Sequence, residues 1–125
     1  MGFNFPKSAK LLKPSEFDRV FSARSSAADG LIVVYAAQNH GEQPRLGLTV
    51  SRKCGNAVVR NRWKRSLREA FRLVQHQLPQ HLDLVVLPKK GATPNVALMQ
   101  KSLLKLTKKI VARQSATNAS KRPPR

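Results

Sequence analysis

The sequence predicts an α+β fold, an α/β sandwich in which three helices cover a four-stranded sheet. Apolar residues recur at steps of three and four in three segments, which is the period of a helix with one buried face. Four short runs between turn signals have the composition of strands. The predicted order is α-β-β-β-α-β-α, and 125 residues suffice for one domain with a real core.

The first helix is predicted to begin at Ser15 and to end near Ser22. Ser15 is its expected N-cap, with Asp18 three residues later in a capping-box arrangement. Phe17 and Phe21 stand four residues apart on this helix. They either fill the core or line a groove in which unpaired bases stack, each base contributing about 1–3 kcal/mol.

Three strands are predicted before the central helix and one after it, at residues 25–28, 31–37, 45–51 and 83–88. Asp29-Gly30 separates the first two and is a strong hairpin signal. In the third run, Leu46, Leu48 and Val50 share one face, and the other face is small and polar: Arg45, Gly47, Thr49 and Ser51. Tyr35 of the second run is either an ordinary half-buried residue or a third aromatic ring beside the two phenylalanines.

The central helix follows a predicted turn at Gly55-Asn56, where backbone N–H groups can approach a phosphate. One face carries an apolar stripe of Val59, Trp63, Leu67, Ala70, Phe71 and Val74. The opposite face carries Asn61, Arg65, Arg68 and Arg72, flanked by Arg60, Arg62 and Lys64. Glu69 alone offers these cations a carboxylate, to Arg65 and Arg72. The basic face is either simply solvated or binds an anion.

The last helix is predicted to start with Thr93 as N-cap and Pro94 at the first helical position, and to end near Arg113. The expected domain is residues 1–113, in which residues 1–13 form an extended arm packed by Phe3, Phe5 and Leu11. Residues 114–125 are polar and basic and are expected to be a disordered tail.

The formal net charge of +18 points to a polyanionic partner, with nucleic acid first. A membrane surface competes, but no apolar run approaches the ~20 residues that a spanning helix needs. Residues 1–7 do not have the pattern of a signal peptide, so we expect a cytoplasmic protein with no membrane partner. A single cysteine, Cys54, excludes an internal disulfide.

Catalytic machinery is missing from the sequence. It shows no paired carboxylates, no nucleophile with a base and no phosphate-binding loop. The three histidines are not spaced as metal ligands. The sequence therefore predicts no catalytic residue and no metal site in this chain, and a binding role.

Residues 53–65, KCGNAVVRNRWKR, closely resemble the signature of the protein subunits of bacterial ribonuclease P. Residues 16–21 resemble the first helix of that family, Tyr35 falls in its second strand, and residues 45–53 resemble its third strand. The resemblance extends over residues 11–111. It implies a left-handed βαβ crossover, an exception to the usual right-handed rule.

The resemblance also implies a function. In this family a large RNA is the catalyst and uses Mg²⁺ to cut the 5′ leader from precursor tRNA, while a small basic protein assists as a monomer within the ribonucleoprotein. The residues expected to bind the catalytic RNA are Arg52, Lys53, Asn56, Arg60, Asn61, Arg62, Lys64, Arg65 and Arg68. Those expected to bind the leader, in a cleft between the first helix and the sheet, are Phe17, Phe21, Tyr35 and Ser51. No strongly bound cofactor is expected in this chain.

Two features depart from the family pattern. Trp63 occupies a position that is more often aliphatic, and the tail after Arg113 is long. Two other functions stay open from the residues alone: a structural RNA-binding protein, such as a ribosomal protein or an RNA chaperone, and a nuclease that acts without RNA.

Overall fold

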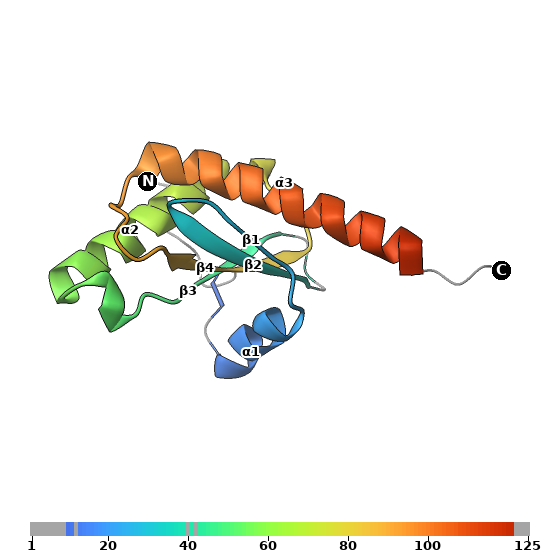
Figure 1. Cartoon of the computed structure of the whole chain (residues 1–125), viewed down its shortest axis with the longest axis horizontal. Coiled ribbons are helices and arrows are strands. Elements are labelled where there is room, and N and C mark those ends of the chain that lie inside the picture. Colours follow the sequence, from blue (N-terminus) through green and yellow to red (C-terminus); the bar gives the residue numbers. More distant parts are fainter. Residues whose placement is uncertain (1–9, 12, 40, 42, 122–125) are drawn as a thin grey trace.

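The computed structural model describes residues 10–11, 13–39, 41 and 43–121, and of residues 114–121 only the backbone. Figure 1 shows a sheet with two long helices on one side and a short helix on the other. The predicted order of elements is confirmed: α1 (Pro14–Ser22), β1 (Ser26–Ala28), β2 (Ile32–Gln38), β3 (Arg45–Leu48), η2 (Arg52–Cys54), α2 (Ala57–Val74), η3 (Gln75–Gln77), β4 (Leu82–Pro88) and α3 (Val96–Lys121).

The four strands lie in the order β1-β2-β4-β3. The predicted hairpin at Asp29-Gly30 is present, because β1 and β2 pair antiparallel with Ala28 opposite Val33. Strand β4 pairs antiparallel with β2 and parallel with β3. Since α2 joins β3 to β4, these elements form the βαβ unit that the family resemblance implied.

The main core lies between the sheet and the pair α2 and α3. Alternate residues of the strands point into it, as the period of two requires. Its largest fully buried side chains include Trp63 and Phe71 of α2, Met99 and Leu103 of α3, and Ile32 of β2. The predicted apolar stripe of α2 is therefore confirmed as the core face of that helix.

Helix α1 covers the other face of the sheet, where it contacts β2 and β4. A second, smaller apolar cluster lies there, with Val20 of α1 and Val85 of β4 fully buried. Leu11 belongs to this cluster, and its N–H donates to the carbonyl of Leu46 at 3.0 Å. The end of the N-terminal arm thus packs beside β3, whereas Phe3 and Phe5 lie outside the described residues.

Two predicted helix starts are corrected. The N-cap of α1 is Lys13, whose N–H donates to Glu16 at 3.1 Å, so Glu16 and not Asp18 closes the first turn. Pro14 takes the first helical position, where its missing N–H costs nothing, and this moves the start ahead of Ser15. At α3, Asn95 replaces Thr93 as cap, because its side chain accepts from the N–H of Leu98 at 2.9 Å.

Two predicted ends are also corrected. Strand β3 ends at Leu48, although the N–H of Thr49 still donates to the carbonyl of Val86 at 3.1 Å, and the chain then turns into η2. Helix α3 continues past Arg113 to Lys121, so its predicted end near Arg113 is corrected, and the disorder expected of the tail stays a prediction. The segment contains no glycine or proline before Pro123, and nothing local stops the helix.

Candidate nucleic-acid interface

The start of α2 is set by a glycine and an asparagine. Gly55 has φ 135°, a conformation that other residues rarely adopt, and a Cβ there would lie 2.9 Å from the side chain of Val59. Asn56 is the N-cap, and its Oδ1 accepts from the N–H of Val59 at 3.0 Å. The predicted turn is present, and the amide oxygen of Asn56 caps the helix.

Burial of the apolar stripe orients the basic face of α2. Trp63 is 1% exposed and Leu67 is fully buried, so the opposite side of the helix must face solvent. The tryptophan that departs from the family pattern therefore belongs to the core and leaves the basic face untouched. Seven of the nine residues predicted to bind RNA are exposed: Arg52, Lys53, Asn56, Asn61, Arg62, Arg65 and Arg68. The remaining two, Arg60 and Lys64, are half-buried.

Apart from Arg72, the cations of this face have no ion pair with a carboxylate in the described part of the chain. Glu69 binds Arg72 in a two-pronged ion pair, with distances of 3.0 Å to Nε and 2.7 Å to Nη2. That hydrogen bonding lowers the pKa of Glu69 and raises that of Arg72. The predicted relief of Arg65 by Glu69 is not observed, because both carboxylate oxygens are taken by Arg72. The charge at Arg65 is thus left for a partner outside the described chain.

Arg60 differs from its neighbours. Its Nε atom is shielded from solvent and has no hydrogen-bond partner among the described residues. A buried donor without an acceptor costs about 1–3 kcal/mol. An anion that reached this donor would therefore recover some of that free energy.

The three aromatic residues predicted to bind the leader meet on the α1 face of the sheet. Phe21 and Tyr35 pack edge to face, with ring centroids 4.9 Å apart and planes at 78°. Phe17 covers Gly47 of β3, where a Cβ would lie 2.8 Å from its ring. All three rings are half-buried and pack against the cluster of Leu11, Val20, Ala37 and Val85. We call these three residues the aromatic patch.

Ser51 does not belong to the apolar cluster against which the three rings pack. It is exposed and precedes η2, and its carbonyl accepts from the N–H of Cys54 at 3.0 Å. The structure thus places it on the approach to α2. Its role in leader binding stays a prediction.

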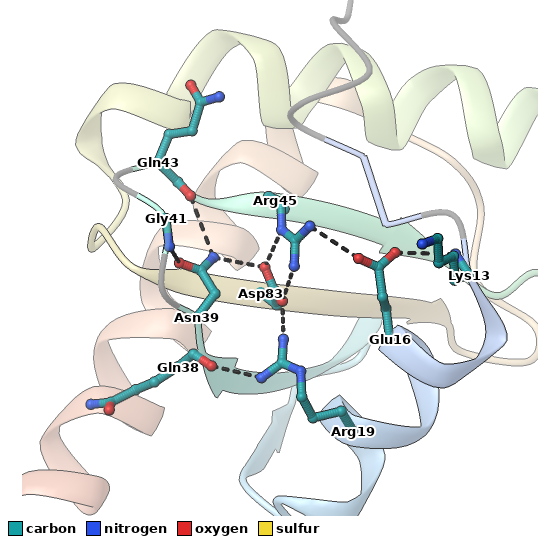
Figure 2. A network of polar contacts seen from close by, with 9 residues as sticks. All are labelled: Lys13, Glu16, Arg19, Gln38, Asn39, Gly41, Gln43, Arg45 and Asp83. Carbon is teal, nitrogen blue, oxygen red and sulfur yellow. Dashed lines mark hydrogen bonds and ion pairs between the residues drawn. The ribbon is translucent and has the colours of Figure 1, made fainter.

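A buried carboxylate beside the aromatic patch was missed by the sequence reasoning. Figure 2 shows Asp83 of β4, which is fully buried, at the centre of a polar network. Arg45 donates to both of its oxygens, at 2.8 and 2.7 Å, and Asn39 donates at 2.7 Å. Arg19 of α1 pairs with the same carboxylate, and Glu16 of α1 accepts from Arg45 at 3.1 Å. The network thus joins α1 to β3 and β4.

The network also stabilises the charged form of Arg45. The hydrogen bond to Asp83 raises the pKa of Arg45 above its already high ordinary value. The signal in the sequence was weak, because an aspartate before an apolar run usually marks a turn. Only the parallel register, which puts Arg45 opposite Asp83, reveals the pair.

Two searches of the described residues bear on the function. No group of three His, Cys, Asp or Glu side chains comes together there in a way that could hold a metal ion. None of the described helices combines the length and the apolar character that crossing a membrane requires.

The fold and the α2 face define the class: a small, strongly basic α+β protein with an exposed cationic helix face on one side of its sheet. A family model described as Ribonuclease P matches residues 5–111. The chain belongs to the Ribonuclease P protein family, and the resemblance seen in the sequence is confirmed.

Named relatives agree with the family. The chain is 39% identical over 119 residues to the ribonuclease P protein component of Brevibacillus brevis, covering 93% of this chain and 94% of the relative. It is 40% identical over 124 residues to that of Pseudoalteromonas translucida, covering 98% and 87%.

Solved structures support the predicted fold. The RNase P protein of Staphylococcus aureus matches with a TM-score of 0.71 at 33% identity, covering 84% of this chain and 96% of that one. The RNase P protein of Thermotoga maritima matches with a TM-score of 0.70 at 31% identity, covering 80% and 96%. The predicted α+β class is confirmed.

Proposed function

We propose that this chain is the protein subunit of a ribonuclease P, which binds the catalytic RNA through α2 and the single-stranded 5′ leader of precursor tRNA on the aromatic patch. It thereby assists the endonucleolytic removal of the leader. Family membership over residues 5–111 supports the subunit role. The division of labour between the two sides of the sheet is our inference from their chemistry.

The observation that carries the RNA-binding role is the exposed charge of Arg62, Arg65 and Arg68 on α2, which pairs with no carboxylate in the described chain. A polyanion supplies the counter-charge that the described chain withholds from Arg62, Arg65 and Arg68. These residues lie on one helix that the buried stripe holds rigidly against the core. With about six phosphates neutralised, affinity falls on the order of 10³-fold between ~50 and ~200 mM salt.

The leader-binding role rests on the half-buried rings. Phe21 and Tyr35 are fixed against each other, so they present aromatic surface at little further cost in side-chain entropy. Every base has a face that can stack on such a ring, whatever the sequence of the leader. Gly47 keeps the strand beneath Phe17 free of a side chain.

The chemistry of cleavage belongs, in this proposal, to the RNA. Mg²⁺ bound by the RNA would activate the attacking water and stabilise the leaving oxygen. The protein contributes positively charged and aromatic contacts that position the two RNAs. We propose that it acts in the cytoplasm as a monomer within the ribonucleoprotein.

Reconstitution tests the proposal. The wild-type protein is mixed with a bacterial ribonuclease P RNA at low Mg²⁺, and we expect it to raise the rate of precursor-tRNA cleavage. The double variant Arg62→Ala/Arg65→Ala should bind the catalytic RNA at least tenfold more weakly at about 0.1 M salt. Lys89→Gln/Lys90→Gln, which removes two charges from an exposed loop, is the matched control and should change the affinity less. No stimulation by the wild-type protein would refute the subunit role.

Leader binding needs a separate variant. Phe21→Leu keeps an apolar side chain in the cluster but removes the ring. It should reduce the preference of the holoenzyme for precursor over mature tRNA by about tenfold, the value of one stacked base, with assembly on the catalytic RNA unchanged. Loss of assembly with the preference intact would reverse the roles assigned to the two faces.

A structural RNA-binding protein is the alternative that the basic face alone would also allow. Recovery of RNA bound to the tagged protein from cells separates the two. One dominant RNA of the catalytic type supports the proposal, and ribosomal RNA supports the alternative.

A further inference from the structure

A basic depression lies at the edge of the sheet formed by β1, apart from the basic face of α2 and from the aromatic patch. Its volume is about 380 Å³, and its lining comes from β1 and α3: Ser26, Ala27, Ala28, Lys109 and Arg113. Helix α3 packs over β1 and β2, whereas α2 contacts β3 at the opposite edge. Figure 1 shows α3 passing along the sheet on the same side as α2. The depression is therefore separate from the basic face of α2.

The two cations of the depression belong to a row on α3. Lys101, Lys105, Lys109 and Arg113 follow one another at steps of four and so lie along one side of the helix. Lys105 pairs with Asp29 at 3.4 Å, and Asp29 also accepts from Ser102 at 2.5 Å. The chain has no acidic residue after Asp83. Among the described residues, Asp29 pairs with Lys105 of this row, and no ion pair joins Lys109 or Arg113 to a carboxylate.

Arg113 is already oriented. Its Nη2 donates to the carbonyl of Ser26, which holds the guanidinium against the strand and leaves its other N–H groups available. Lys109, one helical turn earlier, adds a second positive charge at the same hollow. A fixed guanidinium beside an ammonium group fits the oxygens of a phosphate, which accept several hydrogen bonds at once.

We propose that Lys109, Arg113 and Ser26 form a second phosphate-binding site, which takes a phosphodiester of the catalytic RNA. The site lies on the same side of the sheet as α2 and on the opposite side from the aromatic patch. This position favours the RNA held by α2 over the leader. The inference rests on the proposed function, and it gives the protein two contacts with one RNA from opposite edges of its sheet.

The test compares the affinity of protein variants for the catalytic RNA between ~50 and ~200 mM salt. Lys109→Gln/Arg113→Gln should weaken binding about tenfold at the lowest salt and make the slope of log affinity against log salt shallower by about 1.5, since two phosphate contacts are lost. Lys89→Gln/Lys90→Gln removes the same charge elsewhere and should leave the slope closer to that of the wild type. Equal effects of the two double variants would overturn the proposal.

A single variant and a second binding measurement show whether the effect comes from lost contacts with the catalytic RNA. Lys109→Gln alone leaves the contact of Arg113 with Ser26 in place, and it should reduce the slope by about 0.8 with unchanged thermal unfolding, so that a folding defect in the double variant does not decide the matter. Binding of precursor tRNA to the assembled holoenzyme is measured in parallel. An effect on the precursor alone would overturn the assignment to the catalytic RNA. Failure of the wild-type protein to bind that RNA would instead refute the proposed function.

Discussion

The two sides of the sheet use charge in opposite ways. On the α2 side, a large apolar core lies beneath the helices, and Arg62, Arg65 and Arg68 stand outside it with no ion pair to a carboxylate in the described chain. On the α1 side, the apolar cluster is small, and a buried carboxylate gathers Arg19 and Arg45 into the structure. Charge is thus left for a partner on one side and used to hold a helix on the other.

This contrast between the two sides predicts which substitutions weaken RNA binding without lowering the stability of the fold. Arg62, Arg65 and Arg68 of α2 can be removed with little effect on folding, because they are exposed and pair with no carboxylate in the described chain. Polar residues on the α1 side cannot, because they fix the helix that carries Phe17 and Phe21. Four experiments test this contrast, from the largest expected effect to the smallest.

Trp63→Ala should destabilise the core between α2 and the sheet. The side chain is 1% exposed, and its loss removes apolar contact and leaves a cavity, at a cost of about 3–5 kcal/mol in the free energy of unfolding. Urea unfolding measures this, and affinity for the catalytic RNA should fall with it. Val58→Ala on the same helix, at a position 69% exposed, is the control and should cost less than about 0.5 kcal/mol. Similar costs for both variants would contradict the core role of the tryptophan.

Asp83→Asn should loosen the α1 side. The variant keeps the shape of the side chain but removes the buried counter-charge of Arg19 and Arg45, of which Arg45 keeps its pair with Glu16, at a cost of about 2–4 kcal/mol in the free energy of unfolding. Preference for precursor over mature tRNA should drop, because Arg19 no longer holds α1 against the sheet. Glu16→Gln removes the negative charge that pairs with Arg45 but keeps an amide oxygen that can accept from the N–H of Lys13, and it should cost less than about 1 kcal/mol. An unchanged preference in a destabilised Asp83→Asn protein would separate the network from the aromatic patch.

Gly47→Ala should disturb the aromatic patch more gently. The new methyl group would lie 2.8 Å from the ring of Phe17 and 3.1 Å from Leu11, so both must shift, at about 1–3 kcal/mol. Leader preference should weaken while affinity for the catalytic RNA is retained. Gly30→Ala, whose methyl group meets nothing within 4 Å, is the matched control. A weaker affinity for the catalytic RNA would show that the two sides are not independent.

Acid should lower the free energy of unfolding by a smaller amount, through protonation of Asp29 at the turn between β1 and β2. Burial raises the pKa of Asp29, but hydrogen bonds from Ser102, Ile32, Leu31 and Lys105 outweigh it and lower the pKa from 3.8 to about 2. Because the folded pKa is below the unfolded one, the stabilisation is complete above about pH 4 and is lost as the pH falls toward 2, by at most about 2 kcal/mol. Urea unfolding should show that the free energies of unfolding of the wild type and of Asp29→Asn differ less at pH 2.5 than at pH 5. A constant difference would contradict the shift.

Local patterns were enough to predict the order of elements, the hairpin and the buried stripe of α2, because each depends on residues close in sequence. The predicted N-cap residues were wrong where a nearby residue could also cap the helix: Lys13 caps α1 in place of Ser15, and Asn95 caps α3 in place of Thr93. The Asp83 network was missed because it needs the parallel register of two strands that α2 separates. The basic face of α2 followed from the helical period, whereas the depression at β1 needed the packing of α3 across the sheet.

The strand order also constrains when the protein can fold during synthesis. Strand β4 lies between β2 and β3, yet it is made after both, so β3 has no strand partner until residues 82–88 have left the ribosome. Early chain segments can form the β1-β2 hairpin but must leave α2 undocked, with Trp63 uncovered. During synthesis, α2 therefore leaves the ribosome before β4 has completed the sheet on which α2 packs. We expect stable binding of RNA by α2 only after β4 has joined the sheet.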